Sequence, residues 1–260
     1  MSKNVLVVYY SQSGQLKSIV DNLMSPFQEK EIAIEWLRVQ PKNDFPFPWT
    51  AKSFFNAMPE SVLGIAAEIS TPQFKHERYD LIVFAYQPWF LSPSIPATSI
   101  LLHPVFKKRV ANTPVVTIIG SRNMWINAQE KIKSLLKQSN AHHVANIVLS
   151  DRHNNFISAV TIQYWMFTGK RDKFLGIFPR PGVSDADIKG TKHFGNEILQ
   201  ALELNDWQGL QQRLVSIKAV EIQTTLMFIE NRAPAIFRLW ANAIIKKKIV
   251  LCGFKSSNII

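Results

Sequence analysis

The apolar run VLVVYY, from Val5 to Tyr10, most constrains the fold of this chain. It shows no alternation of polar and apolar positions, which is typical of a strand covered on both faces. A small polar turn follows, and apolar residues then recur at helical spacing until Pro26, where we expect the helix to end. A buried strand, a tight turn and an amphipathic helix form the first unit of a parallel α/β sheet.

Four further segments have the composition of strands: residues 32–39, where the alternation is imperfect, residues 80–86 and 114–119, which are apolar as in buried strands, and residues 145–149. We expect a helix over residues 127–138, and a loop through the proline-rich stretch PKNDFPFPWT after the second strand. Strands that alternate with helices over about 150 residues are typical of α/β domains. The pattern therefore predicts a doubly wound, five-stranded parallel sheet.

The pattern changes after Asp151. Residues 155–169 are apolar and rich in aromatic side chains, and helical patterns follow at 185–203, 206–219 and 225–248. Ser184 precedes the first of these helices and Asp187 stands three residues later, which is the spacing of a capping box. We therefore divide the chain into an α/β domain, residues 1–151, and a mostly helical C-terminal extension, residues 152–260, packed on it.

Composition limits the possible classes of function. The single cysteine, Cys252, excludes an internal disulfide and a multi-cysteine zinc site, and we expect it to be a packing residue of the tail. We expect no metal site. The first apolar run is too short for a signal peptide, and no segment reaches the roughly 18 uninterrupted apolar residues of a membrane span. These features favour a cytoplasmic protein.

The net charge of +11 is spread over both halves of the chain. Its densest cluster is Lys246, Lys247 and Lys248, followed by the run from Lys107 to Arg109. Proteins that bind nucleic acid gather their charge in a stripe, so we do not expect nucleic acid as a partner. A diffuse basic surface suits an anionic small molecule, an acidic carrier protein or an anionic membrane surface.

Three loops follow predicted strands, at the sheet edge where open parallel sheets bind ligands. The first, SQSGQL, brings hydroxyls and backbone N–H groups to a helix N-terminus, which suits a phosphate or simply caps the helix. The second, residues 87–104, holds four prolines, with Trp89 and Phe90 as an aromatic wall or as core. The third begins at Gly120 and contains Arg122, a partner for an anion or a solvated surface charge.

SQSGQL matches neither the dinucleotide fingerprint nor the P-loop. It resembles the phosphate loop of the flavodoxin-like family, [ST]-x-[ST]-G-x-[ST], which wraps the phosphate of FMN; Ser11, Ser13 and Gly14 match, and Leu16 departs. This resemblance implies a flavodoxin-like fold and FMN as the cofactor. The residues then expected to bind FMN are Ser11, Gln12, Ser13, Gly14, Gln15, Leu16, Pro88, Trp89, Phe90, Leu91, Gly120, Ser121, Arg122 and Asn123.

A longer resemblance covers most of the chain. The stretches VLVVYYSQSGQL, FPFPW, SFFNAMPESVLGI, YQPWFLSPSIP, GSRNMWINAQEKIK and DRHNN resemble the dialkylresorcinol condensing enzymes of bacterial polyene-pigment pathways. Condensation needs a nucleophilic cysteine at a helix N-terminus, and Cys252, near the end of the chain, does not suit that role. The resemblance therefore implies an FMN-dependent oxidoreductase, an aromatase that oxidises a cyclohexanedione intermediate to a dialkylresorcinol. Its implied partners are a hydrophobic small-molecule substrate and a separate ketosynthase.

Such a substrate carries two alkyl chains and needs an apolar channel. Residues Phe156 to Phe167, which include Tyr164, Trp165 and Met166, are either candidate lining of this channel or ordinary core. We assign no catalytic residue. His153 is the most suggestive candidate for acid–base chemistry, and the weaker candidates are His142 and His143.

Two other hypotheses remain open. A flavodoxin-fold accessory protein without catalysis would explain the departure at Leu16. A peripheral membrane protein would use the helix at residues 225–248, with an apolar face of Phe228, Ile236, Phe237, Trp240 and Ile244. In each case we expect a homo-oligomer.

Overall fold

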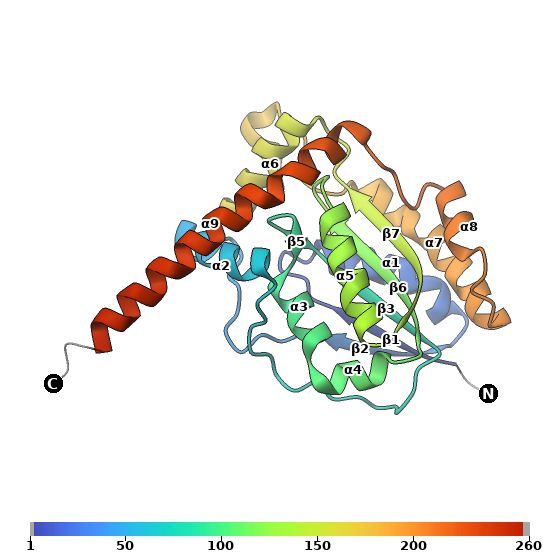
Figure 1. Ribbon diagram of the computed structural model, residues 1–260. Helices are drawn as coiled ribbons and strands as arrows, with labels where there is room; N and C mark the ends of the chain where they lie inside the picture. Colours follow the sequence, from blue (N-terminus) through green and yellow to red (C-terminus); the bar gives the residue numbers. More distant parts are fainter. Residues whose placement is uncertain (1–2, 257–260) are drawn as a thin grey trace.

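The computed structural model describes the backbone of residues 3–256 and the side chains of residues 3–246 (Figure 1). The side chains of Lys247, Lys248 and Cys252 therefore lie outside the described residues. The strands are β1 (Asn4–Tyr9), β2 (Ala33–Arg38), β3 (Leu81–Tyr86), β4 (Pro88–Trp89), β5 (Ser92–Pro93), β6 (Pro114–Ser121) and β7 (His142–Ser150). The helices are α1 (Gln15–Glu29), α2 (Ala51–Leu63), α3 (Ile95–Leu102), α4 (Pro104–Val110), α5 (Ile126–Gln138), α6 (Asn155–Thr168), the short 3₁₀ turn η1 (Phe174–Gly176), α7 (Asp185–Leu204), α8 (Leu210–Ser216) and α9 (Thr224–Ser256).

The central sheet has five strands in the order β2-β1-β3-β6-β7. Every neighbouring pair is parallel. This order is that of the flavodoxin-like doubly wound sheets, so the predicted fold class is confirmed. The chain changes direction across the sheet between β1 and β3, which places a ligand crevice at the carboxyl ends of these two strands.

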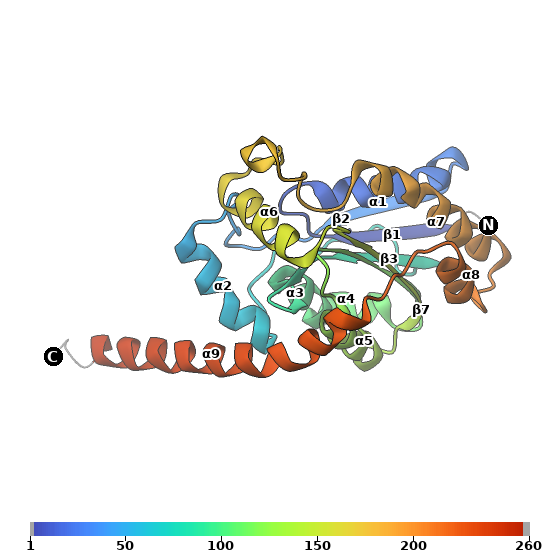
Figure 2. The ribbon, with the colours of Figure 1, turned by 90° about the horizontal axis from the view of Figure 1, so that it is seen from above.

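Helices cover both faces of the sheet (Figure 2). Val5 and Val7 of β1 pack with α1, α7 and α8, whereas Leu6 and Val8 pack with α3, α4 and α5. All four side chains are fully buried. The two cores explain why the first strand is apolar at consecutive positions rather than at alternate ones.

Helix α1 continues through Pro26 to Glu29, so the expectation that it ends at Pro26 is wrong. A proline inside a helix leaves the carbonyl four residues earlier without its N–H donor. Here Ser25 Oγ donates to that carbonyl, the oxygen of Asn22, at 2.8 Å. Phe27 is fully buried beyond the proline and extends the apolar face. The hydroxyl and the apolar contact together keep the last turn helical.

The second loop is also shorter than expected, because residues 95–102 and 104–110 form α3 and α4. Pro96 and Pro104 stand in the first turns of these helices, where a missing N–H has no cost. Helix α2 was not predicted from the proline-containing sequence. It begins at a capping box between Thr50 and Ser53 and ends at Gly64, whose φ is +69°.

Helices α6 to α9 follow β7, and α7 and α8 share the core on the same face of the sheet as α1. The predicted N-cap of α7 is confirmed: the backbone N–H of Asp187 donates to Ser184 Oγ at 3.0 Å. Helix α7 packs closely on α1, because a Cβ at Gly195 would lie 2.0 Å from the carbonyl oxygen of Leu23. Helix α9 then crosses beside α2 and runs outward (Figures 1 and 2). Over the described residues, none of the helices combines the length and the hydropathy needed to cross a bilayer.

Candidate functional site

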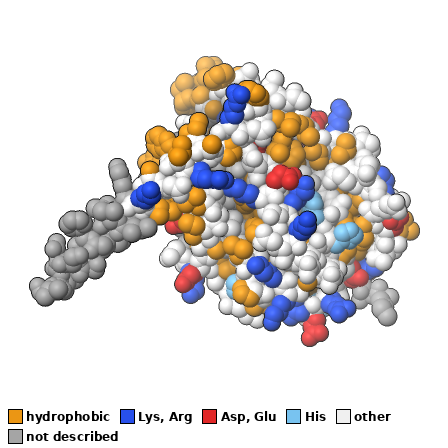
Figure 3. All heavy atoms as spheres, in the orientation of Figure 1, with side chains coloured by type: hydrophobic (Ala, Val, Ile, Leu, Met, Phe, Trp, Pro, Cys, Tyr) orange, Lys and Arg blue, Asp and Glu red, His pale blue; other side chains and the backbone are white. Residues whose placement is uncertain are grey.

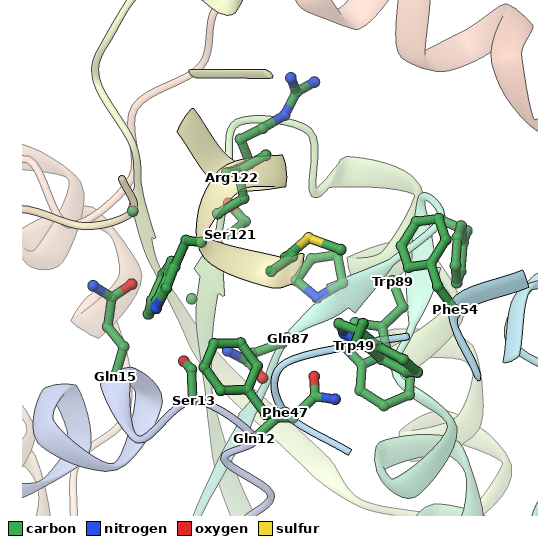
Figure 4. Close-up of a pocket in the computed structure, with 17 residues that line it drawn as sticks. Gln12, Ser13, Gln15, Phe47, Trp49, Phe54, Gln87, Trp89, Ser121 and Arg122 are labelled. Atoms are coloured by element: carbon green, nitrogen blue, oxygen red, sulfur yellow. The ribbon is translucent and has the colours of Figure 1, made fainter. Parts of the chain in front are cut away.

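A cavity of about 250 Å³ lies at the carboxyl edge of the sheet (Figure 4). The three loops picked out in the sequence meet there, together with the segment before α2, helix α6 and the turn before α7. Its walls are mostly aromatic and apolar. They are formed by Gln12, Ser13, Gln15, Phe47, Trp49, Phe54, Gln87, Pro88, Trp89, Phe90, Gly120, Ser121, Arg122, Ile162, Trp165, Met166 and Gly182.

The first loop joins β1 to α1 through a left-handed glycine. Gly14 is the N-cap of α1 with φ +87°, a conformation that glycine adopts without strain, and a Cβ there would meet open space. Ser11 Oγ accepts the backbone N–H of Lys17 at 3.2 Å. The N–H groups that begin α1, those of Gln15 and Leu16, have no intrahelical acceptor and carry the positive end of the helix dipole. This end of the site is suited to an anion.

Two glutamines of this loop are held by backbone groups from distant segments. Gln15 exchanges two hydrogen bonds with the backbone of Val183, both 3.1 Å long. Gln12 Nε2 donates to the carbonyl oxygen of Pro46 at 2.8 Å. These side chains therefore draw the turn before α7 and the proline-rich segment against the loop, and so help to close the cavity.

The second loop supplies the aromatic wall. The ring of Trp89 lies 5.1 Å from that of Phe45 and 5.2 Å from that of Trp49, both edge to face. Phe90 and Leu91 form the two-residue turn between β4 and β5, with φ values of +50° and +59°. Both values belong to a type I′ hairpin turn, a conformation that costs free energy for bulky residues. The hairpin thus directs Phe90 to the cavity while Trp89 is fixed by its neighbours.

The opposite wall comes from segments far along the chain. Phe47 and Trp165 meet edge to face with their ring centroids 5.9 Å apart. Ile162, Trp165 and Met166 all come from α6, which packs its inner face over the cavity. The backbone N–H of Trp49 donates to the carbonyl oxygen of Met166 at 2.7 Å, which ties this wall to the segment before α2.

The second and third loops each bring a polar atom to the sheet edge of the cavity. Among the described residues, Ser121 Oγ and Gln87 Oε1 are buried without a hydrogen-bond partner. An unpaired buried polar atom costs about 1–3 kcal/mol, so a native protein needs a reason to keep two in one cavity. Gly120 packs tightly on α1, because a Cβ there would lie 3.2 Å from Leu16 Cδ1.

Arg122 is the charged residue among those that line the first cavity, and its guanidinium lies beside the start of α6. Its Nη1 donates to the carbonyl oxygen of Asn155 at 3.4 Å, and its guanidinium points away from Ser13 and Phe47 in Figure 4. Burial lowers the pKa of Arg122 from its usual value, and the nearby carboxylate of Asp151 opposes this shift. The guanidinium nevertheless stays charged at neutral pH.

Asp151 organises the region beneath Arg122. Its carboxylate is buried and accepts hydrogen bonds from Ser158 Oγ at 2.9 Å, from the backbone N–H of His153 at 2.9 Å and from that of Gly182 at 3.3 Å. These contacts join the end of β7, helix α6 and the turn before α7. One buried carboxylate therefore ties two wall segments, α6 and the turn before α7, to the end of β7.

A second cavity of about 360 Å³ adjoins the first and shares Pro88, Phe90 and Arg122 with it. The side chain of Asn123 is nine-tenths buried, and within the described part of the chain its Oδ1 has no hydrogen-bond partner. The remaining lining is apolar and comes from the second loop, from Met124 and from α9. It consists of Leu91, Met124, Ile229, Ala233 and Phe237.

The residues that were predicted from the sequence to bind FMN occupy three different places in the structure. Nine line the first cavity, namely Gln12, Ser13, Gln15, Pro88, Trp89, Phe90, Gly120, Ser121 and Arg122. Leu91 and Asn123 line the second cavity. The other three stand around the start of α1: the Ser11 hydroxyl accepts a backbone N–H, Gly14 is exposed, and the Leu16 side chain is fully buried in the core below the loop.

Sequence reasoning missed much of the wall. Three of the missed residues, Phe47, Trp49 and Phe54, lie in or just after the stretch FPFPWT. Its alternation of aromatic residues and prolines could have indicated a rigid loop that presents aromatic side chains. Of the suggested channel segment, residues 156–167, the inner face with Trp165 does line the cavity. Tyr164 instead donates to Asp172 Oδ1 at 2.9 Å on the surface.

The candidate histidines lie elsewhere. His153 is exposed and is not among the residues that line the two described cavities. His142 and His143 stand at the start of β7, which is the opposite edge of the parallel sheet. In the described part of the chain, none of the three histidines is therefore placed to act in these cavities.

Solved structures of flavoproteins resemble this chain in overall arrangement. A flavodoxin from the domain Archaea is 10% identical, with a TM-score of 0.42 over 77% of this chain and 99% of its own. A flavoprotein from Lactobacillus acidophilus in complex with FMN is 20% identical, with a TM-score of 0.40 over 57% and 91%. RosB, with a bound formylriboflavin phosphate intermediate, is 12% identical, with a TM-score of 0.41 over 83% and 81%.

The fold is flavodoxin-like. The strand order itself assigns it, because the similarities to solved structures are too low to carry more. No family model and no curated protein matches the sequence. A fold of this kind hosts many functions, so function must be argued from the cavity and its residues.

Proposed function

We propose that this protein binds FMN in the first cavity and acts as a flavin-dependent oxidoreductase. One observation carries the proposal: the described residues leave Ser121 Oγ and Gln87 Oε1 buried and unpaired at the sheet edge of an aromatic-walled cavity. Once their side chains turn toward the cavity, both atoms would pair with hydrogen-bonding groups on one edge of a flat ring, and the ring would stack on the aromatic walls. The crevice at the switch point between β1 and β3 is where sheets of this order hold FMN.

Each part of the site suits one part of FMN. The N-terminus of α1, with Ser13 and the open Gly14, suits the phosphate. Trp89, Phe47 and Trp165 suit the faces and rim of the ring. The cavity volume of about 250 Å³ is below the usual range of about 300–1,000 Å³ for ligand pockets, so the cavity would hold the ring of FMN rather than the whole molecule. The phosphate would then lie outside the cavity, beside Gly14. When bound, FMN supplies an acceptor for two electrons.

We further propose an aromatase reaction, which rests on the resemblance to the dialkylresorcinol-forming proteins. In this reaction a cyclohexanedione loses a hydride to the flavin and a proton, and tautomerises to a resorcinol. The second cavity supports this proposal, because its lining is mostly apolar and includes the polar side chains of Arg122 and Asn123. The Arg122 cation would stabilise an enolate oxygen, and Asn123 Oδ1 would accept a ring hydroxyl. A separate ketosynthase would supply the dione.

The absorption spectrum of the purified protein tests the cofactor assignment. We expect flavin bands, or micromolar binding of added FMN to colourless protein. Ser13→Asp combined with Gly14→Val should abolish binding, since a carboxylate repels the phosphate and valine is strained at φ +87°. Ser13→Asp alone should weaken binding without strain. Ser18→Asp is the matched control, because Ser18 is exposed in the first turn of α1 rather than in the loop that precedes it.

One observation favours a second candidate, a flavodoxin-fold accessory protein without catalysis. The Leu16 side chain is buried where the resembled phosphate loop carries a hydroxyl, and Ser11 Oγ is engaged by the backbone N–H of Lys17. This candidate predicts tight association with a ketosynthase and no oxidation of a cyclohexanedione by FMN-loaded protein. Formation of resorcinol under single-turnover conditions, with bleaching of the flavin band, would exclude it.

A further inference from the structure

The helices that wall the two cavities also present apolar side chains to solvent. On α9, Leu239 is 71% exposed and Trp240 64% exposed, and on α6 Phe156 is 80% exposed. Exposed apolar side chains are common singly, but a group of them on neighbouring elements marks a site of interaction. We call this group the entrance surface. It comprises Phe55 of α2, Phe156, Ile157, Val160 and Phe167 of α6, and Phe228, Ile229, Ile236, Leu239 and Trp240 of α9.

The entrance surface surrounds the cavities. Phe54, which lines the first cavity, packs against both Phe55 of α2 and Phe167 of α6, with ring centroids 5.5 Å away in each case. Ile229 lines the second cavity and is itself half exposed. Seen from above, α6 and α9 lie on opposite sides of this region with α2 between them (Figure 2). Each of the three helices thus has one face in a cavity and another in solvent.

Among the described side chains of α9, the charged ones that reach solvent are all basic. Arg232, Arg238 and Lys246 are exposed, whereas Glu230, the acidic residue among the described side chains of α9, is buried. The guanidinium of Arg232 lies 3.9 Å from the centre of the Phe228 ring, so one charge stands directly on the apolar face. Figure 3 shows this mixture of hydrophobic and basic side chains along α9 and its surroundings. The surface is therefore complementary to an apolar layer with an anionic boundary.

We propose that the entrance surface binds an anionic lipid membrane and opens the cavities toward it. Helices with aromatic and aliphatic side chains on one side and basic residues beside them lie in the membrane interface. Aromatic rings are favoured at the headgroup level. Each basic residue near an anionic surface adds about 1 kcal/mol of attraction. An apolar ligand would then reach the cavities from the lipid layer without crossing water.

Charge disfavours a second copy of the chain as the occupant. A two-fold dimer brings the same surface of both subunits together. Such an interface would bury Arg232 and Arg238 of both copies between two surfaces of the same charge, with no exposed acidic residue among the described side chains of α9 to pair with them. An anionic lipid surface meets both requirements, because it accepts the apolar side chains and neutralises the basic ones.

Co-sedimentation with vesicles tests the proposal on the full-length protein. We expect binding to vesicles of phosphatidylglycerol and phosphatidylcholine, and weak or no binding to pure phosphatidylcholine. Leu239→Asp should lower the partition coefficient about tenfold or more, because it replaces an inserted apolar side chain by an anion. Leu204→Asp is the matched control and should change little, since Leu204 is 69% exposed but lies at the end of α7, away from the entrance surface.

A second pair of variants tests the charge component. Replacing Arg232 and Arg238 by alanine should weaken binding about fivefold for each charge removed, and added salt should weaken it further. The control pair is Lys108→Ala with Lys137→Ala. These exposed lysines belong to α4 and to the end of α5, at the edge of the sheet opposite the cavities (Figure 1).

Three results would overturn the proposal. The first is the absence of binding to anionic vesicles, and the second is binding that Leu239→Asp leaves unchanged. The third is a vesicle-independent dimer, seen by analytical ultracentrifugation, that Leu239→Asp dissociates. Binding to an acidic carrier protein without any binding to anionic vesicles would also overturn the proposal. Vesicle binding needs no flavin, so its outcome is independent of the FMN assignment.

Discussion

The side-chain amide of Gln15 pairs with the backbone of Val183 in both directions. Its Nε2 donates to the Val183 carbonyl and its Oε1 accepts the Val183 N–H, each over 3.1 Å, across 168 residues of sequence. The neighbouring Gly182 fits the same contact, because a Cβ there would lie 2.8 Å from both Gln15 Oε1 and Trp165 Cζ3. The first turn of α1 and the turn before α7 are thus held as one wall of the cavity.

Gln15→Ala should lower the free energy of unfolding by about 1–3 kcal/mol, since it leaves the N–H of Val183 without a partner, whereas the Val183 carbonyl keeps the Arg171 Nη2 donor at 2.6 Å. It should also weaken FMN binding, because the wall is loosened. Urea denaturation and a flavin titration measure the two effects. Gln138→Ala is the control, for Gln138 is exposed and donates a single local hydrogen bond to Ser134 Oγ. Equal stability of the two variants would show that the pair does not hold the wall.

Ser121→Ala separates binding from folding. The Ser121 hydroxyl has no partner among the residues described, so its removal should leave the stability of the flavin-free protein equal or slightly higher. The same change should raise the dissociation constant of FMN about threefold to tenfold, the value of one hydrogen bond. Ser94→Ala is the control, because Ser94 Oγ is equally buried and unpaired within the described chain but does not line the first cavity. An unchanged dissociation constant in Ser121→Ala would remove Ser121 from the cofactor site.

The sheet and the meeting of the three loops were predictable from local sequence. The run from Val5 to Tyr10 specifies a strand buried on both faces, and parallel strands bring the loops at their carboxyl ends to one edge whatever the details of the helices. Prolines misled the prediction at Pro26 and across residues 95–102. The effect of a proline depends on neighbours such as Ser25 and on its position in the turn, and neither is visible in a hydropathy pattern.

The far wall was not predictable in the same way. Phe47, Trp165 and Gly182 reach the cavity through contacts between distant segments, such as the bond from Trp49 to Met166 and the pairing of Gln15 with Val183. The periodicity of apolar residues in a sequence gives no information about such contacts. The sequence marks Phe156 to Phe167 as apolar, but only the folded chain divides that helix into an inner face and an exposed one.

His143 should make stability depend on pH. Burial, followed by the charge of Lys133, lowers the pKa of its imidazole from 6.5 to about 4, and Nε2 lies 2.9 Å from Thr117 Oγ1. Between pH 6.5 and 4 the His143 imidazole is protonated in the unfolded chain but neutral in the folded chain. Stability should therefore be fully present above pH 6.5 and fall by up to about 3 kcal/mol as the pH drops toward 4.

His143→Gln should flatten that part of the pH profile, measured by urea denaturation at several pH values. Its immediate neighbour provides the control: His142 is exposed, and His142→Gln should keep the wild-type slope. If the slope survives in His143→Gln, another group titrates in this window and the His143 imidazole is not its source.

Glu230 should also make stability depend on pH, but here the contribution to stability falls as the pH rises. Its buried carboxylate accepts the backbone N–H of Asn127 at 2.8 Å and so anchors α9 to the start of α5. Burial raises its pKa above the ordinary 4.5, against the lowering effect of the N–H groups that begin α5. The folded state therefore holds the Glu230 proton more tightly than the unfolded chain does, and this contribution declines as the pH rises from 4.5 through the raised pKa.

Glu230→Gln keeps an acceptor for the Asn127 N–H but cannot ionise. The stability of this variant relative to wild type should therefore increase as the pH rises above 4.5, which urea denaturation over a pH series would measure. Glu130→Gln is the control on α5, where Glu130 is exposed and pairs with Lys133. A constant difference between Glu230→Gln and wild type across the series would mean that Glu230 carries the same charge in the folded and unfolded states. In that case its role would be limited to the hydrogen bonds that fix α9 beside the second cavity.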